Sequence, residues 1–225
     1  MPIDAVFLLK KIVALVISLL LLNVVLILLF PEVYLASNFS ITLLLTNLFL
    51  GADIAIRPFM YQEGKRDRYQ TRFLLLFLLA CPVLIAFPYL EYSFIQSTFL
   101  SPVATNVFWI MGTLLILLGG TTLVASRIIL GTYGTLKIGI DEDHKLITRG
   151  PFHYIRHPIY AGTLILLFGY TVSFSSIISL AIMLLIVIPL GRGRMALEEK
   201  LLIQEFGDEY LEYMKRTKRI IPFLY

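Results

Sequence analysis

The sequence predicts an all-α polytopic membrane protein with about six transmembrane segments, the last two forming a short helical hairpin that precedes a cytoplasmic amphipathic C-terminal helix. Three observations support this. Hydrophobic residues make up 58% of the 225 residues, above the roughly 45 to 50% usual in soluble domains. The apolar residues form runs close to the roughly 20 needed to cross a bilayer. Charged residues gather between these runs, which leaves no stretch long enough for a separate soluble domain.

Residues 1–130 form the first predicted region, a four-span membrane unit. Its first apolar run is longer than the roughly 7 to 15 residues of a cleavable signal peptide, so we expect a true span. The expected spans are Ile12 to Phe30, about Phe39 to Met60, Phe73 to about Leu90, and about Asn106 to Leu130.

Two features inside these spans are expected to organise helix contacts. Asp53 and Arg57 lie one helical turn apart, where an ion pair would partly neutralise both charges in a low-dielectric setting. Glycines in the fourth span would let another helix approach closely, namely Gly112, Gly119 and Gly120.

Residues 131–225 form the second predicted region. About fifteen apolar residues follow Pro158, and at 1.5 Å per residue they reach only about 22 Å, short of a bilayer core of about 30 Å. We therefore expect a tight hairpin with its turn at 173–176 and a second arm ending near Pro189. A separate helix from about Arg194 to Phe206, a break at Gly207 and a short helix over 208–216 should follow.

The distribution of charge predicts the orientation. With six spans, all 19 lysines and arginines lie on the side of the two termini or at span ends facing it, and the positive-inside rule makes that side cytoplasmic. The net charge of +4 therefore reflects topology and does not indicate nucleic-acid binding. The single cysteine, Cys81, excludes a disulfide framework.

The stretch from Arg149 to Gly162 concentrates arginine, histidine, tyrosine and X-Pro steps where a charged loop meets an apolar run, which indicates a site. Further polar and aromatic residues follow at regular spacing. The whole pattern consists of Gly150, Phe152, Arg156, His157, Pro158, Tyr160 and Gly162, then Glu198, Glu199 and Leu202, then Phe206, Gly207, Tyr210 and Tyr213, and finally Ile221 and Pro222.

This pattern resembles the signature of the isoprenylcysteine carboxyl methyltransferase family, integral-membrane methyltransferases related to phospholipid N-methyltransferases. The resemblance covers about the last 90 residues and implies S-adenosyl-L-methionine as cofactor. Glu198 suits the cofactor's ammonium group, while His157 and Tyr160 can donate to its carboxylate or ribose, and Phe152 can pack on its adenine. The cofactor-binding residues implied are His144, Lys145, Leu146, Ile147, Phe152, His157, Pro158, Ile159, Tyr160 and Glu198.

The resemblance makes Arg194 the catalytic residue that faces the methyl acceptor. A guanidinium orients a carboxylate through two parallel hydrogen bonds but repels an alkylammonium, so the residue favours an anionic carboxylate acceptor. Together with the resemblance, this implies carboxyl O-methylation of a lipophilic small-molecule or lipidated, isoprenylcysteine-like acceptor. A carboxylate needs no general base, whereas an amine would need one, and Glu199 or His153 is the nearest candidate.

Three alternatives remain open from the sequence. The first is a phospholipid amine N-methyltransferase, whose GxG pattern is similar to Gly191-Arg-Gly193, although that tripeptide is equally suited to a helix end. The second is an NADPH-dependent membrane enzyme similar to sterol reductases, and the third is a non-catalytic scaffold. The expected partners are the acceptor and the bilayer, with no metal and no nucleic acid. The last basic residues, Lys215, Arg216, Lys218 and Arg219, are expected to bind anionic headgroups.

Overall fold

The computed structural model describes residues 37–56, 83–91, 101–131 and 146–221, together with Val24, Leu28 and Pro31. These residues are mostly helical and contain no β-strand beyond one isolated bridge, which confirms the all-α class for the described part. Apart from Val24 and Leu28, the first predicted span lies outside the described residues, as do the charged residues 62–72 that follow the second span. The named elements are α3 (Ser37–Ile56), α6 (Pro102–Leu130), η3 (Gly150–His153), α7 (Pro158–Ser173), α8 (Ile177–Ile182), η4 (Met183–Val187), α9 (Ile188–Phe206) and α10 (Asp208–Arg216); residues 83–91 are also helical.

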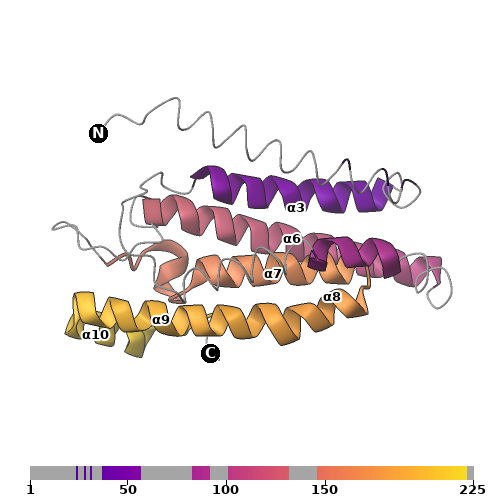
Figure 1. Ribbon diagram of the computed structural model, residues 1–225. Helices are drawn as coiled ribbons and strands as arrows, with labels where there is room; N and C mark the ends of the chain where they lie inside the picture. The colour runs from indigo at the N-terminus through magenta and orange to yellow at the C-terminus, as the bar shows by residue number, and fades with distance from the viewer. Residues whose placement is uncertain are drawn as a thin grey trace.

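The long helices lie side by side, with α3 beside α6, α6 beside α7, and the α8 to α9 helix on the other side of α7 (Figure 1). The contact between α6 and α7 runs along glycines. A Cβ on Gly169 of α7 would lie 2.6 Å from the carbonyl oxygen of Gly112, and one on Gly162 would lie 2.7 Å from that of Gly119. The two backbones therefore touch without intervening side chains, as the sequence predicted for Gly112 and Gly119.

The third predicted glycine, Gly120, faces a different helix. A Cβ there would meet the ring of Phe49 on α3, so this glycine makes room for an aromatic side chain rather than for a backbone. The adjacent glycines of α6 thus serve two neighbours, and α6 is held between α3 and α7.

A buried apolar core fills the space between α3, residues 83–91, α6, α7 and η4. The ring centroids of Phe39 and Phe174 are 4.6 Å apart, and the hydroxyl of Tyr170 donates to the carbonyl oxygen of Ile85 at 2.9 Å. The fully buried large side chains are Tyr89, Tyr170, Tyr210, Phe174, Leu43, Leu84, Ile116, Leu123, Leu166, Leu167 and Met195. All but Tyr210 and Met195 belong to one core cluster, which holds the far end of α7 in place.

The hairpin turn is found where the sequence predicted it. Helix α7 ends at Ser173, and Ser176 precedes α8 and accepts a hydrogen bond from the backbone N–H of Ser179 at 3.1 Å. The carboxylate of Glu91 accepts from the Ser176 hydroxyl and, at 3.0 Å, from the backbone N–H of Ile178. Glu91 therefore caps the start of the second arm, where backbone N–H groups lack helical partners.

The second arm of the hairpin, which begins at Ile177, differs from the prediction. The sequence suggested an interruption between Pro189 and Arg194, but α8, η4 and α9 form one continuous helix from Ile177 to Phe206. The reason is the π-helical turn over Met183–Val187, which shifts the hydrogen-bond ladder just before Pro189, so that the proline falls in the first turn of α9. Gly191-Arg-Gly193 is consequently inside a helix and does not end one. The predicted break at Gly207 is confirmed, with φ of 52°.

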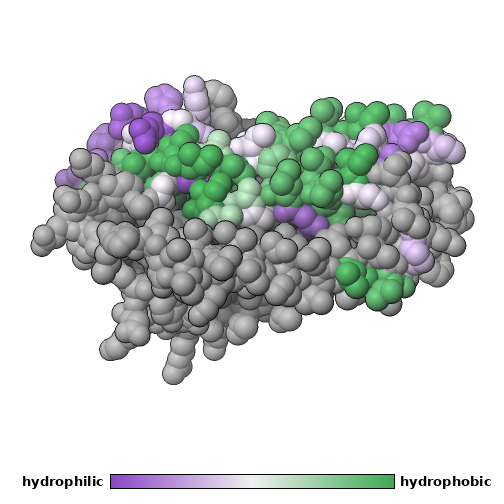
Figure 2. Space-filling model, turned by 90° about the horizontal axis from the view of Figure 1, so that it is seen from above, coloured by the Kyte–Doolittle hydropathy of each residue, from purple (hydrophilic) through white to green (hydrophobic). Residues whose placement is uncertain are grey.

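Two described helices are long and apolar enough to cross a membrane, Pro102–Leu130 and Ile177–Phe206, while α7 is shorter. Large apolar side chains are exposed on both, among them Leu114 at 61% and Leu185 at 75%. On the face shown in Figure 2, apolar side chains lie along the middle and hydrophilic ones mainly toward the ends. Apolar surface on this scale is typical of contact with lipid.

A buried ion pair joins α3 to α6. Arg127 donates from Nε to Oδ1 of Asp53 at 2.8 Å, and both side chains are less than 10% exposed. The sequence analysis paired Asp53 with Arg57, which lies outside the described residues, and it missed Arg127 because the two residues are 74 positions apart. An ion pair at this depth neutralises two charges where water is scarce.

Candidate functional site

The candidate site forms where three parts of the chain meet at the first turn of α7. These are the loop 154–157 after η3, the polar half of α9, and residues 217–219 after α10, called here the C-terminal segment. A parallel bridge joins Ile155 to Lys218, and the backbone N–H of Arg156 donates to the carbonyl oxygen of Lys218 at 2.8 Å. The backbone N–H of His157 donates to Arg219 at 3.0 Å. Backbone hydrogen bonds therefore hold the C-terminal segment against residues 155–157.

Two of the predicted cofactor residues meet directly. The hydroxyl of Tyr160, in the first turn of α7, donates to Oε2 of Glu198 on α9 at 3.0 Å. The rings of Tyr160 and His157 pack edge to face with centroids 5.6 Å apart. His157 and Glu198 therefore both contact Tyr160, close enough for one small molecule to reach both.

Arg194 lies one turn before Glu198 on the same helix and is 6% exposed. Its guanidinium is close enough to the Tyr160 hydroxyl to interact with it electrostatically. The predicted catalytic residue therefore lies beside the predicted cofactor residues, and a carboxylate and a guanidinium both face the start of α7.

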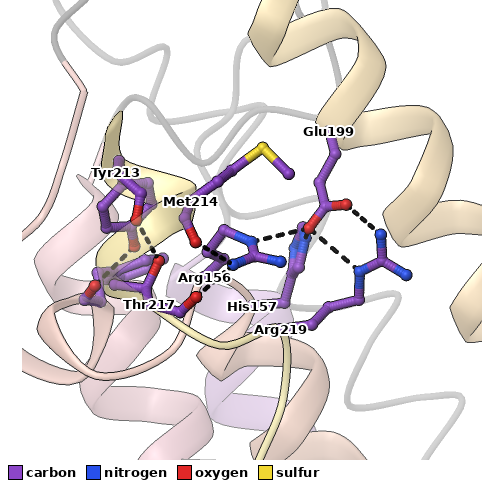
Figure 3. A network of polar contacts seen from close by, with 8 residues as sticks. Arg156, His157, Glu199, Tyr213, Met214, Thr217 and Arg219 are labelled. Atoms are coloured by element: carbon purple, nitrogen blue, oxygen red, sulfur yellow. Dashed lines mark hydrogen bonds and ion pairs between the residues drawn. The ribbon is translucent and has the colours of Figure 1, made fainter. Parts of the chain in front are cut away.

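A second layer is built around Glu199, which is 4% exposed. Arg156 donates from Nε to Oε1 of Glu199 at 2.9 Å, and Nε2 of His157 lies 3.2 Å from the same oxygen. Arg219 donates from Nε to Oε1 at 3.2 Å and from Nη2 to Oε2 (Figure 3). These four residues, Arg156, His157, Glu199 and Arg219, are called the Glu199 cluster below.

The Glu199 carboxyl lies beyond the apolar part of its helix, which ends near Leu190. Burial by itself would raise its pKa, but hydrogen bonds from His157, Arg219 and Arg156 outweigh burial and bring the pKa well below its usual value. The group is therefore an ionised hydrogen-bond acceptor at neutral pH, and a poor proton acceptor.

The remaining hydrogen bonds of Arg156 and its neighbours hold α10 against the loop. Arg156 donates from Nη1 to the carbonyl oxygens of Met214, at 3.2 Å, and Thr217. Tyr213 donates to the carbonyl oxygen of Phe152 at 2.6 Å, and burial raises the pKa of its hydroxyl to about 12, so it stays a donor. Tyr213, a residue of the recognised pattern, therefore ties α10 to η3 through a specific hydrogen bond.

The other predicted cofactor residues are distributed around this site. Phe152 is buried in η3, Pro158 is buried at the first position of α7, and Ile159 is half-buried against the core. Leu146 and Ile147 are half-buried in irregular chain before η3. His144 and Lys145 lie outside the described residues.

Sequence reasoning missed the Glu199 cluster as a unit. It considered Glu199 as a base for an amine acceptor, and it assigned Arg219 to lipid headgroups, whereas Arg219 binds Glu199 with its side chain 24% exposed. Lys215 pairs with Glu212 at 2.5 Å, on an exposed face of α10. The available signal was position, since Arg219 lies just before the Ile221-Pro222 step that closes the recognised pattern.

Comparisons with known proteins place this chain among membrane methyltransferases. A family model described as phospholipid methyltransferase matches residues 107–209. Protein-S-isoprenylcysteine O-methyltransferase A of Arabidopsis thaliana is 32% identical over 139 residues, covering 60% of this chain and 70% of the relative. The corresponding enzyme of Saccharomyces cerevisiae is 31% identical over 126 residues, covering 54% of this chain and 52% of that protein. Protein-S-isoprenylcysteine O-methyltransferase B of A. thaliana is 37% identical over 89 residues, covering 40% of this chain and 45% of that protein.

The fold has a counterpart among solved structures. The structure of a eukaryotic intramembrane Ras methyltransferase, isoprenylcysteine carboxyl methyltransferase, matches with a TM-score of 0.62 at 18% identity, covering 92% of this chain and 73% of that one. Fold and matched sequence together define the class, which is that of the helical integral-membrane methyltransferases. Within this class, the chain belongs to the isoprenylcysteine carboxyl methyltransferase family. It spans about half the length of several of the curated relatives that it matches.

Proposed function

We propose that the protein is an S-adenosyl-L-methionine-dependent methyltransferase that esterifies the carboxylate of a lipophilic, isoprenylcysteine-like acceptor. One observation carries this proposal: Arg194 and Glu198, one turn apart on α9, both lie at Tyr160, next to His157. The arrangement offers one cationic and one anionic group at the polar end of membrane-spanning helices, and an acceptor carrying both a carboxylate and an apolar chain matches that position.

The residues present fit the methyl donor chemically. A carboxylate at Glu198 suits an ammonium group, Tyr160 and His157 supply polar hydrogen-bonding groups, and the buried ring of Phe152 suits a flat base. When bound, S-adenosyl-L-methionine supplies a methyl group on a cationic sulfur, which a carboxylate oxygen takes as the carbon–sulfur bond breaks. Arg194 orients the acceptor carboxylate, and the apolar helices keep water away from it.

The second candidate is N-methylation of a phospholipid amine, which the description of the matched family favours. An amine acceptor must lose a proton, and the structure gives poor bases for this. Glu199 is held ionised by two arginines, and His153 is exposed and packs its ring against Tyr154. A carboxylate acceptor needs no base, so the absence of a good base among these candidates supports O-methylation.

The placement in the membrane is part of the proposal. Residues 1–130 would form a four-span region that shapes the acceptor pocket, and residues 131–225 would form the cofactor-binding catalytic region, with six spans in all. The two regions form one packed unit because α6 and α7 touch through their glycines. The active site and both termini would face the cytoplasm, as the positive-inside rule predicts.

The test separates donor, acceptor and bond type. Purified protein is titrated calorimetrically with S-adenosylhomocysteine and with NADPH, and it is then incubated with methyl-labelled donor and either an N-acetylated S-farnesylcysteine or phosphatidylethanolamine. We expect S-adenosylhomocysteine to bind, and label to enter the farnesylcysteine in an alkali-labile form, because methyl esters hydrolyse in alkali.

Three outcomes would contradict the proposal. Alkali-stable label on phosphatidylethanolamine would indicate the N-methyltransferase. Binding of NADPH alone would indicate a reductase. Binding of neither cofactor by folded protein would indicate a scaffold.

A further inference from the structure

Of the Glu199 cluster, only His157 has a role in the proposed reaction; Arg156, Glu199 and Arg219 have none. The cluster is built from three separate parts of the chain, since Arg156 and His157 precede α7, Glu199 lies on α9 and Arg219 belongs to the C-terminal segment. Burying a carboxylate together with three nitrogen-bearing side chains costs desolvation free energy, so this arrangement calls for a role beyond stability.

The protonation of His157 follows from what Glu199 is able to do. An ionised carboxylate only accepts hydrogen bonds, so Nε2 of His157, 3.2 Å from Oε1, must carry a proton. The same carboxylate also pairs with Arg156 and Arg219. A neutral ring that is hydrogen-bonded to this carboxylate carries its proton on Nε2. In that tautomer Nδ1 has a free lone pair and can only accept.

We propose that Glu199 is a positioning residue that fixes His157 in the Nε2–H tautomer, and that Arg219 makes the C-terminal segment part of this lock. His157 then presents Nδ1 as a hydrogen-bond acceptor toward the methyl donor. The contact between Nδ1 and the methyl donor rests on the proposed function. It also revises the expected role of His157, which would accept from a hydroxyl or amine N–H of the donor rather than donate to its carboxylate.

The tautomer can be observed without any ligand. Protein labelled with ¹⁵N-histidine is examined by long-range ¹H–¹⁵N correlation in detergent at neutral pH, and the signals of His157 are identified by their loss in His157→Asn. We expect a protonated Nε2 and an unprotonated Nδ1. A proton on Nδ1 at neutral pH, in the other neutral tautomer or in an imidazolium, would overturn the lock.

Two variants test which residues set the tautomer of His157. In Glu199→Gln the amide can either donate or accept, so we expect the two neutral tautomers to mix; an unchanged pattern would remove Glu199 from this role. Because that variant leaves two guanidinium groups uncompensated, Arg219→Gln serves as the milder case, since the Arg219 side chain is partly exposed. The matched control is Arg216→Gln, which removes the same charge from an exposed position on α10.

The effect on binding completes the test. We expect Arg219→Gln to weaken S-adenosylhomocysteine binding about tenfold, as for the loss of one charged hydrogen bond, and Arg216→Gln to leave it unchanged. Equal effects of the two variants would mean that the C-terminal segment acts only through net charge. If His157 is locked but no S-adenosylhomocysteine binds, the proposed function fails while the lock stands. If methyl transfer occurs with His157 unlocked, this inference alone fails.

Discussion

The two ends of α7 are each secured by a buried carboxylate, and the two carboxylates have opposite surroundings. At the Ser173 end, Glu91 accepts from neutral donors, the Ser176 hydroxyl and the Ile178 backbone. At the Pro158 end, Glu199 accepts from two guanidinium groups and an imidazole. Glu91 only satisfies the hydrogen bonds of neutral donors. Glu199 lies among cationic groups, so it also sets the local charge and the position of the proton on the imidazole it contacts. The first is therefore expected to secure the hairpin and the second to organise the site.

The largest effect is expected for Glu199→Ala, which removes the carboxylate at the Pro158 end of α7. Removing the carboxylate leaves the largely buried Arg156 and the partly exposed Arg219 without their partner, and breaking a buried pair costs about 3 to 5 kcal/mol. We expect a large drop in thermal unfolding temperature in detergent and loss of S-adenosylhomocysteine binding. Stability equal to the wild type would mean that the cluster is not closed in the folded protein.

Arg194→Lys tests the Pro158 end at the neighbouring residue. Lysine keeps the charge but loses the planar pair of donors, so we expect methyl transfer to a farnesylcysteine carboxylate to fall about hundredfold, with S-adenosylhomocysteine affinity within about threefold. Steady-state kinetics and calorimetry measure the two quantities. Arg192→Lys, an exposed position on the same helix, is the matched control. Unchanged turnover in Arg194→Lys would remove the acceptor-orienting role.

The middle of α7 supplies a test of packing that touches neither carboxylate. In Gly119→Ala the new methyl group meets the backbone of α7, 2.6 Å from the Gly162 oxygen, so we expect a destabilisation of about 1 to 3 kcal/mol. Gly191→Ala is the control, because a Cβ there meets nothing within 4 Å and alanine favours the helix. Chemical unfolding in detergent compares them. Equal stability of the two variants would contradict close backbone contact between α6 and α7.

Glu91→Gln should have a smaller and purely structural effect. The amide can still accept from one donor, so we expect a loss of about 1 to 2 kcal/mol in the free energy of unfolding. Donor binding, measured on folded protein, should stay within about twofold of the wild type. A loss of binding as large as that of Glu199→Ala would mean that both ends of α7 organise the site.

The smallest expected effect is a dependence of stability on pH. The pKa of Glu199 is lower in the folded than in the unfolded protein, so its contribution is complete above the ordinary carboxyl pKa of about 4.3 and is lost as pH falls below it. Thermal unfolding between pH 6 and pH 3 should show this slope in the wild type and less of it in Glu199→Gln. Identical slopes would contradict the lowered pKa.

In the described residues, much of the fold could be predicted from the sequence because its signals are local. The hairpin turn at 173–176 follows from the lengths of the apolar runs, the break at Gly207 from a residue that adopts positive φ, and the contact of α6 with α7 from the glycines. The prediction was wrong at Pro189, where a proline with two nearby glycines suggested an interruption. A π-helical turn keeps this helix continuous, and such a turn has no clear sequence signature.

The candidate site was only partly predictable, because only some of its contacts follow from local sequence signals. The sequence alone determined that Glu198 and Arg194 share a helix face and that both belong near His157, because helical periodicity and a recognised pattern act over short distances. Only the tertiary structure decided which carboxylate His157 contacts, that Arg219 turns inward, and that Asp53 meets Arg127. These pairs join residues from 20 to 74 positions apart, and a charged side chain finds its partner by proximity in space, which no local pattern encodes.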